Sequence, residues 1–307
     1  MKRVVMTGAT GTIGMALIQR CIKEETEVIV LCHKNSKRVK LIPENSFIKL
    51  IECNLEELAL FSLDNVGYDV FYHFAWEATW GNSRNNVEIQ MKNIQYTLDA
   101  VKLAYRLKCR RFIGAGSQAE YGRYEGTLQP DTPAFPENGY GIAKLCAGQL
   151  SKLLCEQLGI DCIWVRVLSV YGPYDGMDTM VSSVTRSFLK QEHVSLTEGE
   201  QVWDYLYSGD AAKAFYLLGT KGKVGKTYVL SGGYNKKLKD YIEIIKEKTG
   251  YHDKPGYGEI PYTANQVMYL SGNILELTQD TGFIPETDFE EGIEYVIEWV
   301  KGVGLQF

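Results

Sequence analysis

Short apolar runs rich in β-branched residues alternate with stretches of helical periodicity through the first half of the chain. The apolar runs cover residues 3–8, 26–32, 46–53, 69–75, 110–117 and 162–168. In the helical stretch at 13–24, Ile13, Leu17 and Cys21 recur every four residues, which gives a helix one apolar stripe. Repeated strand–helix units of this kind build a parallel sheet covered by helices. We therefore predict an α/β fold with a doubly wound parallel sheet.

The regular alternation ends near Gly172, where the sequence becomes rich in tyrosine and in loop-forming residues. One further strand-like run lies at 226–232. A chain of 307 residues exceeds the usual size of a single core. We therefore predict a sheet domain at 1–172 plus about 205–235, and a smaller C-terminal α/β unit that binds substrate, at about 173–204 and 236–307.

A glycine-rich segment, TGATGTIG, joins the first predicted strand to the first predicted helix. Gly8, Gly11 and Gly14 allow a tight turn and a close approach to a pyrophosphate, whose charge meets free N–H groups at the helix N-terminus. The spacing is G-x-x-G-x-x-G and departs from the usual G-x-G-x-x-G. A tight strand-to-helix connection is the simpler interpretation, but the second strand about 20 residues later is typical of dinucleotide binding. We predict a Rossmann-type dinucleotide-binding domain.

The end of the second predicted strand indicates which dinucleotide binds. An acidic residue there would bind the ribose 2′-hydroxyl of NAD, whereas the 2′-phosphate of NADP needs positive charge. This chain has no carboxylate at that place and offers instead Cys32, His33, Lys34, Ser36, Lys37 and Arg38. A solvated basic loop is the alternative interpretation. The pattern favours NADP, with NAD possible.

The segment YGIAK places Tyr140 and Lys144 four residues apart, on one face of a helix. A free phenol has a pKa near 10, and an adjacent ammonium favours the phenolate. The pair therefore predicts a general acid and base.

These motifs, together with HFA at 73–75, Asn93, GSQAEYG at 116–122 and VYGP at 170–173, resemble the extended short-chain dehydrogenase/reductases. Within that group the chain is similar to the NAD(P)-dependent nucleotide-sugar epimerases, dehydratases and reductases. The resemblance implies that Tyr140 is the catalytic acid and base, that Lys144 binds the nicotinamide ribose and that Ser117 bonds the reacting sugar oxygen. Asn93 is expected to complete a proton relay through water. The cofactor contacts that the resemblance implies are Gly8, Gly11, Thr12, Ile13, Gly14, His33, Lys34, Arg38, Asn54, Leu55, Phe74, Ala75, Tyr140, Lys144 and Leu168.

The sugar dehydratases of this group carry an Asp-Glu pair directly after the serine or threonine, where this chain has Gln118 and Ala119. Glu120 comes one residue later. In extended backbone a shift of one residue turns a side chain to the opposite face. We therefore expect Glu120 to be structural or to rim the substrate site, and we do not expect dehydration.

Two further positions depart from the family pattern and concern the substrate. Trp203 replaces the arginine that usually grips the nucleotide diphosphate, although Asp204 and Asp210 still match the pattern, and Ser169 replaces an asparagine before VYGP. Arg186 is a candidate for the missing phosphate contact, with an exposed helix residue as the alternative. The predicted substrate contacts are Trp76, Gln118, Ser169, Arg186 and Trp203.

The function that these residues predict is an NADP-linked oxidoreductase, a 4-keto-sugar reductase acting at C4 of a nucleotide-activated hexose or deoxyhexose. A nucleotide-sugar 4-epimerase with tightly bound NAD is the alternative. A second alternative is a non-catalytic NADP(H)-sensing or RNA-binding member of the fold, although such members commonly lose the Tyr-x-x-x-Lys pair that this chain keeps.

Composition narrows the partners and the compartment. A net charge of −5 argues against nucleic-acid binding, and no apolar run approaches the ~18 residues of a membrane span. The four histidines lack metal-ligand spacing, so no metal is expected. Seven scattered cysteines, and a first apolar run too short for a signal peptide, favour a cytoplasmic chain. The resemblance implies a homodimer formed by the helix after HFA and the helix of Tyr140.

Overall fold

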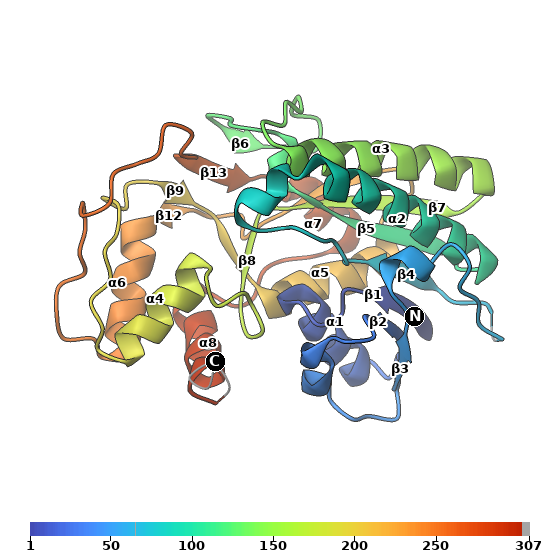
Figure 1. Cartoon of the computed structure of the whole chain (residues 1–307), viewed down its shortest axis with the longest axis horizontal. Helices are drawn as coiled ribbons and strands as arrows, with labels where there is room; N and C mark the ends of the chain where they lie inside the picture. The colour runs from blue at the N-terminus through green and yellow to red at the C-terminus, as the bar shows by residue number, and fades with distance from the viewer. Residues whose placement is uncertain (65, 303–307) are drawn as a thin grey trace.

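Seven parallel strands form the central sheet of the computed structural model, which describes residues 1–64 and 66–302 (Figure 1). All seven predicted runs are strands, within two residues at either end. The sheet order is β11-β7-β5-β4-β1-β2-β3, so the direction of strand addition reverses between β1 and β4. The strands are β1 (Arg3–Thr7), β2 (Glu27–Cys32), β3 (Ile48–Glu52), β4 (Val70–His73), β5 (Arg111–Ser117), β7 (Asp161–Val167) and β11 (Thr227–Leu230).

Helices cover both faces of this sheet, which confirms the doubly wound Rossmann-type prediction. One face carries α1 (Thr12–Lys23), α5 (Ser208–Lys221) and α7 (Leu275–Thr281), and the other carries α2 (Val87–Arg106) and α3 (Gly139–Leu158). The predicted stripe of α1 packs on the sheet, since Leu17 and Cys21 are fully buried there and Ile13 is partly buried. Burial of such stripes on both faces stabilises the sheet and holds the carboxyl ends of its strands at one edge.

A smaller unit packs around three further helices, α4 (Met180–Leu189), α6 (Leu238–Thr249) and α8 (Phe289–Gly302). They gather at the end of the molecule away from β3 and enclose an aromatic core that includes Phe188, Tyr241 and Phe289 (Figure 1). Short strands join this unit to the sheet domain: β8 (Ser169–Tyr171) pairs with β10 (Tyr205–Tyr207), while β12 (Lys236–Lys237), β9 (Val202–Trp203), β13 (Tyr269–Gly272) and β6 (Thr127–Leu128) form a second sheet.

The packing modifies the domain division expected from the sequence. Residues 236–307 were all expected in the smaller unit, but Leu277 and Phe283 are fully buried in the core that α1 and α5 share with the central sheet. We therefore propose that α7 and the segment up to Phe283 belong to the sheet domain.

Short 3₁₀ turns complete the described chain and carry several residues of the site. They are η1 (Lys37–Leu41), η2 (Leu55–Glu57), η3 (Gly81–Asn85) and η4 (Gln118–Glu120). Across residues 1–64 and 66–302, no helix combines the length and the apolar character that a bilayer crossing requires.

Candidate active site

The connection from β1 to α1 needs its glycines for two different reasons. A Cβ on Gly8, which has a φ of +71°, would lie 2.6 Å from the Phe74 carbonyl carbon, and one on Gly14 would lie 2.6 Å from the Gly8 oxygen. The protein's own backbone therefore excludes side chains at both positions. A Cβ on Gly11 would meet only the Gly8 oxygen, at an ordinary 3.7 Å. Gly11 thus leaves open surface where a ligand can approach the backbone closely.

The first turn of α1 suits an anion. Its N-cap residue, Gly11, offers no side chain to the free backbone N–H groups, and the turn contains no acidic residue. Unbonded N–H groups and the positive end of the helix dipole attract a phosphate group. The loop therefore suits the pyrophosphate of a dinucleotide cofactor, and the contact of its glycines with that group stays a prediction.

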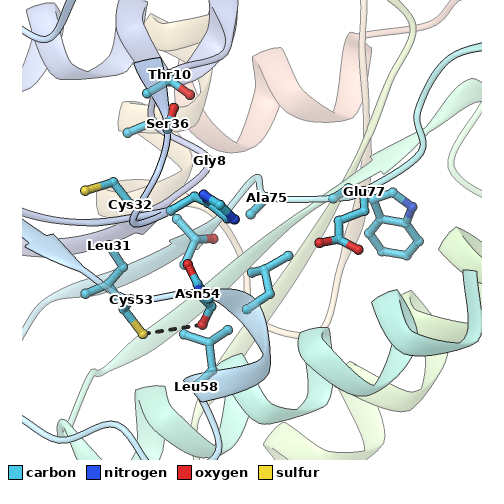
Figure 2. Close-up of a pocket in the computed structure, with 15 residues that line it drawn as sticks. Gly8, Thr10, Leu31, Cys32, Ser36, Cys53, Asn54, Leu58, Ala75 and Glu77 are labelled. Carbon is cyan, nitrogen blue, oxygen red and sulfur yellow. Dashed lines mark hydrogen bonds between the residues drawn. The ribbon is translucent and has the colours of Figure 1, made fainter. Parts of the chain in front are cut away.

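A cavity of about 230 Å³ opens beside this loop, where the carboxyl ends of β1 to β4 meet (Figure 2). It lies where the order of strand addition reverses, which is where open α/β sheets bind their ligands. Five of the predicted cofactor contacts line it: Gly8, His33, Asn54, Leu55 and Ala75. The ring of Phe74 turns into the core instead and packs on Phe215, with 4.8 Å between ring centres. For Leu168, which is buried beside Val229, a cofactor contact stays a prediction.

The two basic side chains expected to bind a 2′-phosphate contact protein groups in the structure. The ammonium of Lys34 forms an ion pair with Glu57 on η2, and the guanidinium of Arg38 donates to the carbonyl oxygen of Tyr174. His33 and Ser36 line the cavity, whereas neither Lys34 nor Arg38 does so. The two side chains on which the NADP prediction depended are therefore bound to protein groups elsewhere.

Three of the four predicted catalytic side chains, those of Ser117, Tyr140 and Lys144, come from β5 and α3. Ser117 ends β5, and Tyr140 and Lys144 lie in the first turns of α3, whose start is capped by Asn138 accepting from the Gly141 N–H at 2.9 Å. Burial raises the pKa of the Tyr140 phenol, and the Ser117 side chain opposes that shift. The lysine ammonium lies 5.8 Å from the centre of the Tyr140 ring.

Lys144 is buried and donates a hydrogen bond of 2.7 Å to the Ala115 carbonyl oxygen. Its ammonium also lies 3.8 Å from the centre of the Trp76 ring. Burial lowers the pKa of Lys144 to about 7, and the nearby Glu120 carboxylate opposes this shift. The ring of Trp76, which was expected to contact substrate, stands nearly perpendicular to that of Tyr140 at 6.0 Å.

Asn93 is buried on α2, and its side chain is occupied by the loop that follows β4. Its amide oxygen accepts from the Glu77 N–H at 3.0 Å, and its amide nitrogen donates to the Glu77 carbonyl at 2.9 Å. Gln90, one turn earlier, accepts from the Trp76 indole at 2.9 Å. These contacts show Asn93 holding the loop that carries Trp76, while its part in a proton relay stays a prediction.

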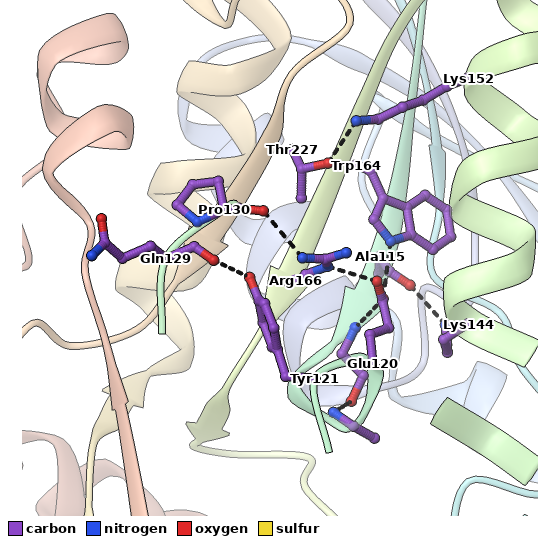
Figure 3. Close-up of polar contacts among 12 residues, drawn as sticks. Ala115, Glu120, Tyr121, Gln129, Pro130, Lys144, Lys152, Trp164, Arg166 and Thr227 are labelled. Carbon is purple, nitrogen blue, oxygen red and sulfur yellow. Dashed lines mark hydrogen bonds and ion pairs between the residues drawn. The ribbon is translucent and has the colours of Figure 1, made fainter. Parts of the chain in front are cut away.

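Glu120 has a structural position, as expected, but for a different reason from the one expected. Residues 118–120 form the 3₁₀ turn η4, so the alternation of an extended strand does not apply to them. The carboxylate is fully buried and pairs with Arg166 at 2.7 Å, and it accepts from the Trp164 indole at 3.0 Å and from the Ser117 N–H at 2.8 Å (Figure 3). Glu120 therefore fixes the backbone of Ser117.

The remaining predicted substrate residues lie in two places. Trp203 and Ser169 touch, with the indole donating to the serine hydroxyl at 2.7 Å. Gln118 lines a second cavity, of about 440 Å³, with Arg84 and the segment around Asn265. Arg186 lies on α4 in the smaller unit, where its phosphate contact stays a prediction.

The two aspartates that match the family pattern accept hydrogen bonds from backbone N–H groups. Asp204 accepts from the Gly232 N–H at 2.6 Å and the Gly233 N–H at 3.2 Å, and Asp210 accepts from the Glu286 and Thr287 N–H groups at 3.1 and 2.9 Å. Both carboxylates thus join segments distant in sequence.

The sequence did not single out Arg84, which the structure places beside Tyr140. Its guanidinium carbon lies 4.6 Å from the centre of the Tyr140 ring. Arg84 lies in the segment GNSRNN, which matches no motif, and only the folding of η3 onto the start of α3 brings it to the site. In the described ranges, no three His, Cys, Asp or Glu side chains are grouped to hold a metal ion.

The fold and this site define a class of enzyme. Residues 4–231 match the NAD dependent epimerase/dehydratase family, and the chain belongs to that family. It is an enzyme of the extended short-chain dehydrogenase/reductases, within the group of nucleotide-sugar epimerases and dehydratases, as the motifs predicted.

Individual relatives are distant but match over nearly their whole length. The chain is 26% identical to YtcB of Bacillus subtilis strain 168, described as an uncharacterised UDP-glucose epimerase, with 98% of each chain covered. It is 27% identical to CDP-abequose synthase of Salmonella muenchen, over 96% of this chain and 97% of the relative. The structure superposes on a UDP-N-acetylglucosamine 4-epimerase from Methanobrevibacter ruminantium M1 with a TM-score of 0.88, 21% identity and 98% coverage of each chain.

Proposed function

We propose that this enzyme is an NAD-dependent nucleotide-sugar 4-epimerase. The 4-keto-sugar reductase that the sequence favoured depended on NADP, and the basic side chains expected to bind its 2′-phosphate are engaged elsewhere. The intact set of Ser117, Tyr140 and Lys144, without the Asp-Glu pair of the dehydratases, is the observation that carries this proposal, and the contacts of Lys34 and Arg38 with protein groups support NAD over NADP. The relatives point the same way, because several of the similar proteins are described as UDP-sugar 4-epimerases.

The cofactor site fits NAD without a charged ribose contact. The part of the cavity at the ends of β2 and β3 offers His33, Ser36 and the side chain of Asn54, whose hydrogen-bonding groups suit a diol. The pyrophosphate would lie against Gly11 and the first turn of α1. A nicotinamide bound in this groove supplies reversible oxidation at C4 of the sugar.

Tyr140 and Ser117 then act on the C4 hydroxyl group and its proton. Tyr140, as phenolate, takes the proton of the C4 hydroxyl when that carbon is oxidised, and returns it when the ketone is reduced. Ser117 holds the C4 oxygen through its hydroxyl. Inversion at C4 requires the ketone to present its other face before reduction, so the same Tyr140 serves both directions.

The substrate is proposed to be a nucleotide-activated hexose held between the two units. The Trp203 indole donates to the Ser169 hydroxyl, on strands that join the two units, and an indole can stack on a base or a sugar ring. Gln118 extends toward the second cavity, where Asn85, Asn138 and Asn265 offer further hydrogen-bonding groups for sugar hydroxyls.

A homodimer is also proposed, through α2 and α3, which pack side by side (Figure 1). Apolar side chains are exposed along both helices; they are Val87, Met91, Ile142, Leu150 and Leu153. Exposed apolar side chains on two packed helices could be covered by a second copy of the chain. Leu153→Lys should lower the molar mass measured by light scattering, whereas Leu60→Lys, at an exposed apolar residue outside both helices, should not change it.

The cofactor proposal has a direct test. Protein purified without added nucleotide is denatured, the released dinucleotide is identified by mass spectrometry, and the affinities of the stripped protein for NADH and NADPH are measured. NAD(H) should be the nucleotide released, and NADH should bind at least tenfold more tightly than NADPH, a difference of ~1.4 kcal/mol. Release of NADP(H), or tighter binding of NADPH, would instead favour the function of a 4-keto-sugar reductase. Binding of neither would favour the non-catalytic alternative.

A further inference from the structure

The catalytic tyrosine has a second cation beside it. The guanidinium carbon of Arg84 lies 4.6 Å from the centre of the Tyr140 ring, closer than the Lys144 ammonium at 5.8 Å. A cation over an aromatic face is attracted to its ring, and the attraction is larger when the ring belongs to a phenolate.

The segment that carries Arg84 is held against the helix of Tyr140 by the side chain of its neighbour and by its own backbone. The side-chain oxygen of Asn85 accepts from the Gly139 N–H at 3.0 Å, at the first residue of α3. A Cβ on Gly139 would lie only 2.9 Å from the Arg84 carbonyl oxygen, so glycine permits this close approach. The 3₁₀ turn η3 therefore packs on the start of α3. The contact residues Asn85 and Gly139 are the chain neighbours of Arg84 and Tyr140.

The charge of Arg84 is not used in an ion pair within the described chain. Its Nε is buried and has no hydrogen-bond partner among residues 1–64 and 66–302. Arg123, which lines the same second cavity, pairs with Glu137 at 2.8 Å. Arg84 thus differs from its neighbour in keeping its charge free to act on the ring beside it.

The other groups around Tyr140 have opposing effects on the stability of its phenolate. Glu120 from η4 disfavours the phenolate, and Ser117 from β5 favours it. Lys144 from α3 is bound to the Ala115 carbonyl oxygen and the Trp76 ring, and its buried ammonium loses its proton more readily than a free lysine. Arginine stays protonated at every pH of interest.

We propose that Arg84 is a positioning residue that acts through Tyr140 by stabilising the phenolate form that accepts the C4 proton. The reaction in which this phenolate is used rests on the proposed function. The effect on the phenolate itself does not depend on that function.

The test measures the phenolate of Tyr140 directly. The ultraviolet absorbance of tyrosinate is titrated with pH in each variant, and the same titration in that variant carrying Tyr140→Phe is subtracted. Arg84→Gln should raise the titration midpoint of Tyr140 by about one pH unit. At a fixed pH below the midpoint, this is roughly a tenfold loss of phenolate. Arg84→Lys, which keeps a charge, should recover most of that loss.

A matched control exists elsewhere in the chain. Arg3 lies 4.5 Å from the centre of the Tyr68 ring, far from the site in the sheet, so Arg3→Gln should leave the Tyr140 midpoint unchanged. If Arg84→Gln does not fold, Gly139→Ala, which pushes the Arg84 backbone away from α3, should move the midpoint in the same direction by a smaller amount.

The same variants are compared in the pH profile of kcat for whichever nucleotide sugar is turned over. The acidic limb should move with the titration midpoint, and the rates should converge at high pH. An unmoved midpoint in folded Arg84→Gln would overturn the proposal, as would an increase in KM with an unchanged pH profile, which would make Arg84 a substrate contact. Absence of 4-epimerisation in the wild type would count against the proposed function alone, because the absorbance titration needs no substrate.

Discussion

The ammonium of Lys144 lies 3.8 Å from the centre of the Trp76 ring, and the Ala115 carbonyl oxygen accepts its hydrogen bond at 2.7 Å. The lysine expected to bind the nicotinamide ribose is therefore held in place by the protein before any ligand contributes. Burial at this position disfavours the charged form and lowers its pKa to about 7.

This shift predicts a pH dependence of stability. In the folded protein Lys144 loses its proton near pH 7, whereas the unfolded chain keeps it to a pH of about 10.4. The unfolded state binds more protons in that interval, so the contribution of Lys144 to stability rises with pH, by up to about 1.4 kcal/mol per pH unit. The free energy of unfolding of the cofactor-free wild type should therefore increase from pH 7 to pH 9 relative to that of Lys144→Met, measured by denaturant titration. Parallel curves for the two proteins would show that the lysine is not desolvated.

Substitutions at two glycines of the loop between β1 and α1 should have different effects, one on cofactor affinity and the other on protein stability. Gly11→Ala adds a Cβ into open surface, so the stability of the cofactor-free protein should change by no more than about 0.5 kcal/mol while dinucleotide affinity falls at least tenfold. Gly14→Ala places its Cβ 2.6 Å from the Gly8 oxygen and should destabilise the cofactor-free protein. Thermal unfolding and cofactor titration of both variants check this contrast. Unchanged cofactor affinity in Gly11→Ala would place the pyrophosphate elsewhere.

The segment after Ser117 predicts which reaction does not occur. Elimination of water across C5 and C6 needs one group to take the C5 proton and another to protonate the departing hydroxyl, and neither Gln118 nor Ala119 can do so. Glu120 is buried in its ion pair with Arg166. Nucleotide-activated 6-hydroxy hexoses incubated with the enzyme and NAD should therefore yield no 4-keto-6-deoxy product by mass spectrometry. Formation of that product would show that Glu120 leaves its pair and reaches the sugar.

The sheet could be predicted because each strand carries its own signal. Buried parallel strands read as short continuous runs of β-branched and apolar residues, and the seven runs of this chain have that form. The glycine loop and the Tyr140–Lys144 spacing are equally local. Each depends on residues within one turn or one strand–helix connection, so the sequence alone identifies them.

Contacts between distant segments could not be predicted in this way. The basic loop suggested NADP because Glu57, which neutralises Lys34, follows the next strand and comes near only when β3 pairs beside β2. Trp164 and Arg166 lie opposite Gly114 and Gly116 in the register of β5 and β7, and these glycines leave room for the Trp164 ring beside Glu120. Arg84 depends likewise on a loop docking onto another helix.

A 4-epimerase that retains its cofactor returns the C4 hydrogen to the sugar, so a substrate labelled at C4 distinguishes it from a reductase. UDP-, dTDP- and CDP-activated hexoses deuterated at C4 are incubated with protein supplied with NAD, and the products are followed by NMR. At least one sugar should give its 4-epimer with the deuterium still at C4 and with no NADPH consumed, and Tyr140→Phe should slow this by ~10²-fold or more with cofactor affinity near that of the wild type. Reduction of a 4-keto-6-deoxy sugar nucleotide at the expense of NADPH, with none of these hexoses epimerised, would contradict the proposed 4-epimerase.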